Sequence, residues 1–418
     1  MKRGGLRRDT IAILTAQSFY RLSGFVLLMV LSRRLGAQDI GAFFFAIAFA
    51  ESFVVIAHFG MSSVMSRRVA SAPSEAAQHF APLLGFRLVS APVYLVVVIG
   101  LATIFTSASP YLIVAAAVIT VLEDLYFSFG SLFLALRKAV YNVTLGISIH
   151  SAYIVAFLVG MTNAPSLQML MGVTLFRAAL LVVAGAALTR ARLFPLKAVW
   201  DSATVKAALP FVLIAALHVL RDQIGTLLLG VKASYEDVAH FNLAWRLVAS
   251  SYFVPTAICA VFVPLLTAHG LTADNRRLLA RSAAAVGAAG LFGAIVAWSL
   301  AEPLAAVLYG PLGPVVAPLI KSLAIVFPLG FLALFLALVL QALYQEAHVL
   351  RTLLFVTAVN LVANWILIPR LAAEGAVYAQ VLSTSMQLAI LAWRLRTLHG
   401  KVQRTDSPEY SIFSDGSP

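Results

Sequence analysis

The feature that most constrains this chain is a series of apolar segments, each long enough for a helix to cross a lipid bilayer. A helix needs about 20 mostly apolar residues to cross the hydrocarbon core. Of the 418 residues, 61% are hydrophobic and 11% are charged, whereas soluble domains carry about 25% charged residues. We therefore predict an all-α polytopic membrane protein with about 12 transmembrane helices. The predicted spans are 10–31, 41–64, 82–105, 110–136, 139–160, 167–189, 208–231, 238–265, 283–308, 317–343, 350–369 and 375–395.

Basic residues determine the predicted orientation of these helices. The loops on the side of the N-terminus hold 20 Lys and Arg residues, and the alternate loops hold 5. Because cytoplasmic loops carry the excess of positive charge, we predict that both termini are cytoplasmic. The same asymmetry accounts for most of the net charge of +13, so we expect no nucleic-acid partner. Five further basic residues lie inside apolar segments: Arg21, Arg87, Arg177, Arg221 and Arg246.

Two segments resemble each other at an offset of 198 residues and indicate an internal repeat, with chance similarity between apolar segments as the alternative. Gln38–Ala50 reads QDIGAFFFAIAFA and Glu236–Val248 reads EDVAHFNLAWRLV, which pairs Asp39 with Asp237. Repeats of six helices keep the same orientation and are related by an axis along the membrane normal. We predict two pseudo-symmetric six-helix lobes around a central cavity, in residues 1–205 and 206–398, followed by a disordered cytoplasmic tail in residues 399–418.

An arginine inside a hydrophobic segment is costly and marks either a structural ion pair or a functional site. At the centre of a lipid-exposed helix it costs at least ~2.5–3.5 kcal/mol. At about 1.5 Å per residue, Arg21, Arg221 and Arg246 fall at similar depths near the middle of the bilayer. Guanidinium groups bind phosphate oxygens in bidentate pairs, so these three are the candidate substrate-binding residues for an anionic ligand such as a pyrophosphate. In the alternative, they pair with Glu51 and Asp222 and hold helices together.

Further polar residues inside the predicted helices are candidates for ion coupling or for lining the cavity. Glu123 and Asp124 are adjacent in mid-helix, where either an ion pair with Arg177 or a proton or sodium site would account for them. Asn360 and Asn364 are four residues apart, so both amides lie on one helix face and favour helix–helix hydrogen bonding. The candidate set is Glu51, Asp222, Glu123, Asp124, Asn360 and Asn364.

The sequence contains none of the motifs that would indicate an enzyme or a bound cofactor. It has no G-x-x-x-x-G-K-[ST] loop for ATP, no H-E-x-x-H zinc motif and no G-x-S-x-G nucleophile elbow. Cys259, the single cysteine, lies in an apolar run and is expected to be a small buried hydrophobic residue. We therefore predict that the protein is not an enzyme, has no catalytic residues and binds no metal or cofactor.

Three stretches carry a family resemblance. Leu31–Ala70 reads LSRRLGAQDIGAFFFAIAFAESFVVIAHFGMSSVMSRRVA, and Leu227–Thr267 reads LLLGVKASYEDVAHFNLAWRLVASSYFVPTAICAVFVPLLT. VLYGPLG at Val307–Gly313 is followed by AVNLVANWILIPRLAAEGAVYAQVLS at Ala358–Ser383. Together they resemble the first-lobe, second-lobe and closing helices of the oligosaccharide flippase family (Wzx-type, polysaccharide biosynthesis proteins). That family is part of the superfamily of multidrug and toxin extrusion transporters and lipid II flippases.

The resemblance implies alternating access between two lobes, with a polyprenyl-pyrophosphate-linked oligosaccharide as the substrate. Such flippases act in the bacterial inner membrane in the synthesis of O-antigen, capsule or exopolysaccharide. Arg21 fits the cavity arginines that engage the pyrophosphate in this family, with Arg221 and Arg246 as second-lobe candidates. The resemblance also implies an H+ or Na+ gradient as the energy source, and membrane lipid and a polysaccharide polymerase or assembly protein as partners.

Two other functions stay open from the sequence. One is an ion-coupled exporter of small amphipathic or drug-like compounds, whose cavity should be net acidic if its substrates are cations. The other is a membrane scaffold that transports nothing and whose interior charges are purely structural.

Overall fold

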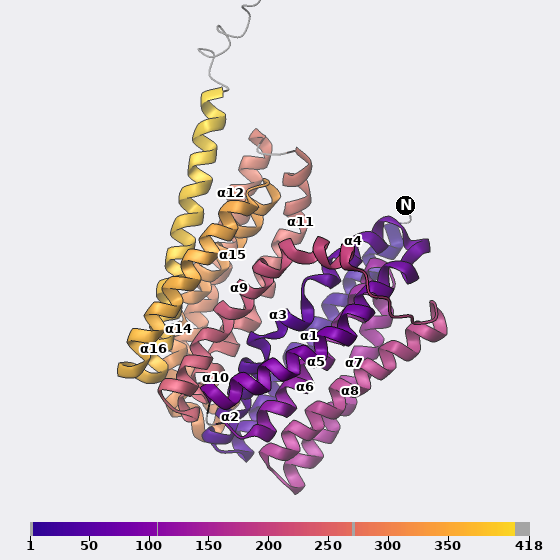
Figure 1. Cartoon of the computed structure of the whole chain (residues 1–418). Coiled ribbons are helices and arrows are strands. Elements are labelled where there is room, and N and C mark those ends of the chain that lie inside the picture. Colours follow the sequence, from indigo (N-terminus) through magenta and orange to yellow (C-terminus); the bar gives the residue numbers. More distant parts are fainter. Residues whose placement is uncertain (1–2, 107, 270–271, 406–418) are drawn as a thin grey trace, which may run out of the picture. The chain divides into compact units, whose positions relative to one another are not determined.

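All regular secondary structure in the described residues is helical, which confirms the predicted fold class. The structure is a computed structural model that describes residues 3–106, 108–269 and 272–405. Figure 1 shows the order of the helices along the chain. The earlier helices are α1 (Arg3–Arg34), α2 (Ala37–Ser52), α3 (Val54–His58), α4 (Met61–Ser71), η1 (Pro73–Glu75), α5 (Ala76–Phe105), α6 (Pro110–Ala135), α7 (Ala139–Asn163) and α8 (Leu167–Arg192).

The later part of the chain contains more short helices. Its last helix, α16, holds a break at Ala372 (φ 49°, ψ −126°), which separates the predicted spans 350–369 and 375–395. The helices are α9 (Ser202–Lys232), α10 (Tyr235–Ser251), α11 (Phe253–His269), α12 (Ala273–Ser299), α13 (Ala301–Tyr309), η2 (Gly310–Leu312), α14 (Gly313–Leu323), α15 (Val326–Ala342) and α16 (Glu346–Thr405).

Two of the predicted long spans are broken near a proline. α11 begins two residues before Pro255, and α15 begins two residues before Pro328. Proline has no N–H to donate and a fixed φ, so it is tolerated in the first turn of a helix and disfavoured in the interior. The chain therefore ends one helix and starts another, and the predicted spans 238–265 and 317–343 are each divided.

These breaks affect the number of recognisable membrane spans. Among the described residues, seven helices are long and apolar enough to cross a membrane, or eight if the bent pair Ala37–Ser52 and Val54–Ser71 is one span. α10 and α11 are each 17 residues long, so neither half of such a broken span is long enough alone. The exact count of 12 predicted spans is not confirmed.

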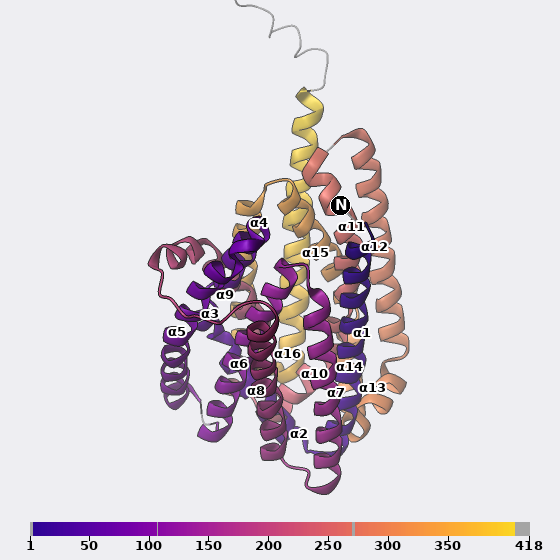
Figure 2. The same cartoon turned by 90° about the vertical axis from the view of Figure 1, so that its right-hand side faces the viewer.

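The chain divides into two compact units. In unit 1, α6 packs against α8, and α1 runs alongside α7 (Figure 2). In unit 2, α15 packs against α11 and α12. The predicted lobes 1–205 and 206–398 stay a prediction. Residues 399–405 of the predicted disordered tail are the helical end of α16, and residues 406–418 lie outside the described residues. Unit 1 consists of Met1–Leu243, Glu302–Ala317 and Ile368–Ala373, and unit 2 of Ala244–Ala301, Pro318–Leu367 and Glu374–Pro418.

Helix boundaries recur at the spacing found in the sequence. α2 begins at Ala37 and α10 begins at Tyr235, which is 198 positions later. α2 ends before a break at Phe53, and α10 ends before a break at Tyr252. The internal repeat indicated by the amino-acid sequence is therefore matched by the positions at which these helices begin and end.

Close packing of α2 against α9 and the start of α10 depends on glycine. A Cβ added to Gly41 would lie 1.6 Å from the carbonyl oxygen of Tyr235. A Cβ added to Gly230 would lie 2.1 Å from the ring of Phe45, and this ring also lies 5.4 Å from that of Tyr235. The absence of side chains at both glycines allows the helices to approach this closely.

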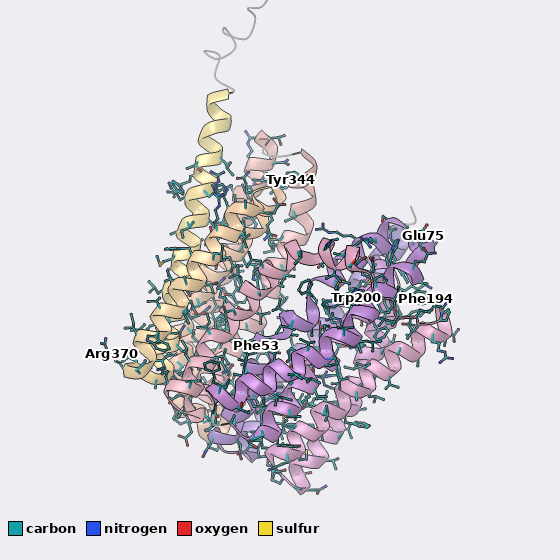
Figure 3. All side chains as sticks on the ribbon, in the orientation of Figure 1. Phe53, Glu75, Phe194, Trp200, Tyr344 and Arg370 are labelled. Carbon is teal, nitrogen blue, oxygen red and sulfur yellow. The ribbon has the colours of Figure 1, made fainter. Side chains whose placement is uncertain are left out.

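The segment between α8 and α9 is fastened to α5. The backbone N–H of Val199 donates to the carbonyl of Ala81 at 3.1 Å. Trp200 stacks on Phe86 with ring centroids 6.2 Å apart, and Phe194 meets Phe80 at 6.3 Å; Figure 3 labels Phe194 and Trp200. These contacts hold the extended segment along the surface of the helix.

Asp201 caps the start of α9, earlier than the predicted residue 208. Its carboxylate accepts from the N–H of Ala203 (3.0 Å) and of Thr204 (3.3 Å), and from the Thr204 hydroxyl. The Thr204 hydroxyl, helped by the two N–H groups, lowers the pKa of Asp201 below its ordinary 3.8. A lowered folded-state pKa means that this stabilisation is complete above the unfolded value and is lost as the pH falls through the folded value.

Replacing Asp201 by alanine is expected to lower the free energy of unfolding by about 1 kcal/mol at neutral pH, because an N-cap is lost. Asp201→Asn keeps a capping oxygen and should cost clearly less. The thermal unfolding midpoint of the purified protein measures both changes. Equal losses in the two variants would contradict the capping role.

Candidate functional site

The predicted substrate-binding arginines lie on three helices. Arg21 on α1 and Arg221 on α9 are half-buried in unit 1, and Arg246 on α10 is exposed in unit 2. The Nε of Arg221 is buried and has no hydrogen-bond partner among the described residues. The joint role of these three residues stays a prediction.

The predicted acidic partners of these arginines differ in their surroundings. Glu51 on α2 accepts a hydrogen bond of 2.6 Å from the side-chain amide of Gln223 on α9. Asp222 on α9 is exposed and adjoins Arg221. Gln223 was not among the residues predicted from sequence, since a single glutamine in a helix carries no motif. Its bond to Glu51 connects two helices that already pack together in unit 1.

Asn360 and Asn364 are buried and bonded within unit 2, as the helix–helix interpretation predicts. The amide of Asn364 donates to the carbonyl (2.8 Å) and the side-chain oxygen (3.0 Å) of Asn360. The amide of Asn360 donates to the Ser383 hydroxyl at 3.0 Å. Ser383 follows the break at Ala372, so the pair ties the two halves of α16 together.

Glu123 and Asp124 have separate partners, although they are neighbours on α6. Glu123 forms an ion pair with Arg177 of α8, as one of the predicted alternatives requires. Consecutive helical residues are rotated by about 100°, so Asp124 points in another direction. There it meets Arg87 of α5 and His58 of α3.

Arg87 is the charged residue that sequence reasoning did not assign. Its guanidinium forms an ion pair with Asp124, and it donates to the carbonyl of Ala57 and, at 3.1 Å, to the Ser128 hydroxyl. The side chains of Arg87 and Asp124 are 6% and 9% exposed. His58 Nδ1 lies 2.7 Å from the other oxygen of Asp124. The sequence did offer one sign of this role: Arg87 lies inside the apolar run 82–105, where a charged residue requires a buried partner.

Arg87, Asp124, His58 and Ser128 form a polar cluster, called here the Arg87 cluster, which also stabilises the interrupted backbone between α2 and α4. A helix break inside a membrane frees carbonyls that need other donors. The carbonyl of Ala57 accepts hydrogen bonds from the Arg87 guanidinium and, at 3.3 Å, from the Ser90 hydroxyl. The carbonyl of Ala50 accepts a hydrogen bond from the Tyr94 hydroxyl at 2.8 Å. One face of α5 therefore holds the break around Phe53.

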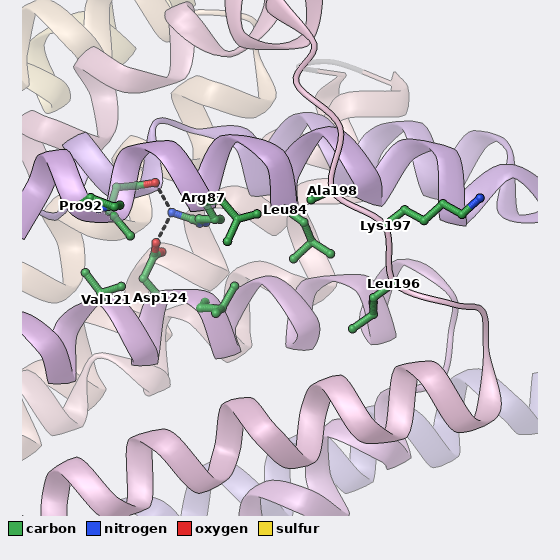
Figure 4. Close-up of a pocket in the computed structure, with 12 residues that line it drawn as sticks. Leu84, Arg87, Pro92, Val121, Asp124, Leu196, Lys197 and Ala198 are labelled. Carbon is green, nitrogen blue, oxygen red and sulfur yellow. Dashed lines mark hydrogen bonds and ion pairs between the residues drawn. The ribbon is translucent and has the colours of Figure 1, made fainter.

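An apolar pocket of about 430 Å³ opens beside this cluster. α5 and α6 form its walls, and the segment before α9 covers one end (Figure 4). Arg87 and Asp124 lie at the wall and form an ion pair with each other, which a dashed line marks in the figure. The rest of the lining includes Leu84, Leu88, Pro92 and Val121, which suits hydrocarbon, and the exposed Lys197 lies at the end formed by the segment before α9.

The fold is similar to solved membrane transporters. One is the inward-facing conformation of a multidrug resistance MATE family transporter of the MOP superfamily, with 13% identity, a TM-score of 0.76 and coverage of 92% of this chain and 96% of that chain. Another is the lipid II flippase MurJ in an inward closed conformation, with 11% identity, a TM-score of 0.73 and coverage of 93% and 87%. A MOP superfamily transporter from Pyrococcus furiosus matches at 14% identity and a TM-score of 0.64, with coverage of 94% and 95%. No curated protein matches the sequence.

The helices and these matches define a multi-pass membrane protein with the two-lobed fold of MATE transporters and MurJ. The family model described as polysaccharide biosynthesis protein matches residues 6–268, which is more than half of the chain. The chain belongs to the polysaccharide biosynthesis protein family, which confirms the resemblance found in the sequence.

Proposed function

We propose that this protein is a flippase that moves a polyprenyl-pyrophosphate-linked oligosaccharide across the bacterial inner membrane by alternating access. Both termini lie in the cytoplasm, and an H+ or Na+ gradient drives the cycle. Arg21, Arg221 and Arg246 bind the pyrophosphate. A polysaccharide polymerase or assembly protein takes over the product on the outer side.

The observation that carries the proposal is the family match over residues 6–268, which includes all three arginines. Two structural facts support it. Arg87 and Arg177 form ion pairs with Asp124 and Glu123, so packing within unit 1 accounts for these two interior arginines. Arg21 and Arg221 are half-buried on helices that the predicted repeat makes equivalent. Half-buried guanidinium groups suit a phosphate ligand that must bind and then leave.

Single replacement of Arg21, Arg221 and Arg246 by alanine is expected to lower surface polysaccharide at least tenfold while the protein stays in the membrane, because a charge-assisted bidentate contact is worth at least ~1.5 kcal/mol. Lysine variants keep the charge but lose the fork geometry and should fall between alanine and wild type. Arg190, exposed in the last turn of α8, is the matched control.

Polysaccharide on the cell surface and folded protein in the membrane are measured in parallel. Normal polysaccharide in all three alanine variants would remove the pyrophosphate site. Loss of the folded protein itself would show that the arginines serve packing. Export of a cationic dye, unaffected by loss of the glycan pathway, would favour the drug exporter instead.

A further inference from the structure

A second pocket in unit 1 has a different character from the apolar one and takes no part in the proposed pyrophosphate site. Its volume is about 500 Å³, within the range of about 300–1,000 Å³ typical of small-molecule sites. The helices α1, α6, α7 and α8 each contribute to its lining. The polar residues of the lining are Tyr20, Glu123, Tyr126, Ser131, Asn142, His150 and Arg177.

Two glycines make room for the polar groups of this pocket. A Cβ on Gly146 would lie 1.9 Å from the hydroxyl oxygen of Tyr20. A Cβ on Gly130 would lie 3.0 Å from the side-chain oxygen of Asn142. Any larger residue at Gly146 would push the Tyr20 phenol away. The backbone of α6 and α7 is thus fitted to hold a phenol and an amide at the pocket wall.

The two charged residues that line the pocket neutralise each other. Arg177 and Glu123 form an ion pair, and the guanidinium also lies 5.3 Å from the ring centroid of Tyr153. An anion would have to displace Glu123 and a cation would have to displace Arg177, and either exchange leaves a charge unpaired. The arrangement therefore favours a neutral ligand that can use both donors and acceptors.

The remaining groups offer hydrogen bonds and ring faces together. The Tyr126 hydroxyl donates to the side-chain oxygen of Asn142 at 3.0 Å, and the amide group of Asn142 supplies donors. His150 lies 2.7 Å from the Ser23 hydroxyl and packs edge-to-face on Tyr20 with centroids 5.2 Å apart. Ring faces carry negative charge density that attracts C–H edges, and a pyranose presents such edges beside its hydroxyls.

We propose that this pocket binds one uncharged sugar unit of the lipid-linked glycan. The inference rests on the proposed flippase function and specifies the part of the substrate that unit 1 recognises. Hydroxyls of the sugar bond to Asn142, Tyr126 and the oxygens of Glu123, and its C–H face packs on an aromatic ring. The pocket thereby distinguishes a glycosylated carrier from a bare one.

Binding of two lipids to the purified protein in nanodiscs tests this inference. The probes are a polyprenyl pyrophosphate without sugar and the same carrier bearing one hexose. The wild type is expected to bind the hexose-bearing carrier about tenfold more tightly, which corresponds to ~1.4 kcal/mol. Asn142→Leu should bring this ratio close to one, and Tyr126→Phe should lower it about threefold, with the affinity for the bare carrier unchanged in both.

Ser148→Leu is the control, since Ser148 is exposed on the same helix α7 and does not line the pocket. It should keep the wild-type ratio, and thermal unfolding midpoints verify that all variants fold. Equal affinity of the wild type for both lipids, or an equal loss for both lipids in Asn142→Leu and Tyr126→Phe, would overturn the sugar site alone. If the wild type binds neither lipid, the proposed function fails and the sugar site with it.

Discussion

Replacing Arg87 by alanine is expected to remove most of the folded protein from the membrane. The change leaves Asp124 charged and buried, and it also removes the donors that reach the carbonyl of Ala57 and the Ser128 hydroxyl. Breaking a buried ion pair by removing one partner typically costs about 3–5 kcal/mol, which is a large share of the stability of a typical protein. Fluorescence-detected size exclusion of the detergent extract would measure the folded fraction.

A double replacement distinguishes loss of pairing from loss of the arginine itself. Arg87→Met combined with Asp124→Leu leaves no buried charge, and such swaps are often close to neutral. We expect the double variant to recover most of the folded protein that the single variant loses. Recovery should be incomplete, because the carbonyl of Ala57 keeps only the Ser90 hydroxyl as a side-chain donor and His58 loses its contact with Asp124. A single variant as stable as wild type would contradict the structural role of the pair.

Replacing Gly41 by alanine is expected to be the most damaging exchange of a single methyl group in unit 1. The added Cβ would lie 1.6 Å from a backbone oxygen of Tyr235, and backbone cannot rotate out of the way as a side chain can. α2 must therefore shift relative to the start of α10. Overpacking of this kind typically costs about 1–3 kcal/mol, and sometimes more. The unfolding midpoint should fall clearly.

Gly100 on α5 provides a control of opposite sign. A Cβ added there meets nothing within 4 Å. Alanine is favoured over glycine inside a helix by roughly 0.5–1 kcal/mol, so Gly100→Ala should raise the unfolding midpoint slightly. If Gly41→Ala and Gly100→Ala change the midpoint alike, the close approach of α2 to Tyr235 is not important for stability.

Much of the fold could be predicted from the sequence, because membrane helices are encoded locally. An apolar run of sufficient length has few alternatives in lipid, so helix positions follow from composition along the chain. The breaks at Phe53 and at Ala324–Ile325 were harder to predict, since each depends on neighbours. Tyr94 and Arg87, for instance, supply the donors that make the first break tolerable, and they come from a different helix.

The polar contacts were predictable only where the sequence left little choice. Arg177 needed a carboxylate, and the adjacent pair on α6 offered one, so its bond to Glu123 was among the expected outcomes. The sequence could not determine which of the two carboxylates would take it. Asp124 faces α5, and its partner Arg87 was recognised as an interior charge without a role. Packing directions of whole helices decide such pairings, and these are not local properties.

The attachment of residues 194–200 to α5 has a mechanical consequence. Val199 and Trp200 immediately precede the first turn of α9, and both are anchored to the same helix. Little slack chain separates α5 from α9, so a tilt of α9 during a transport cycle would pull directly on α5. The linker should therefore couple the movements of α5 and α9. Lengthening it with a few glycines should uncouple these movements without changing any proposed ligand-binding residue.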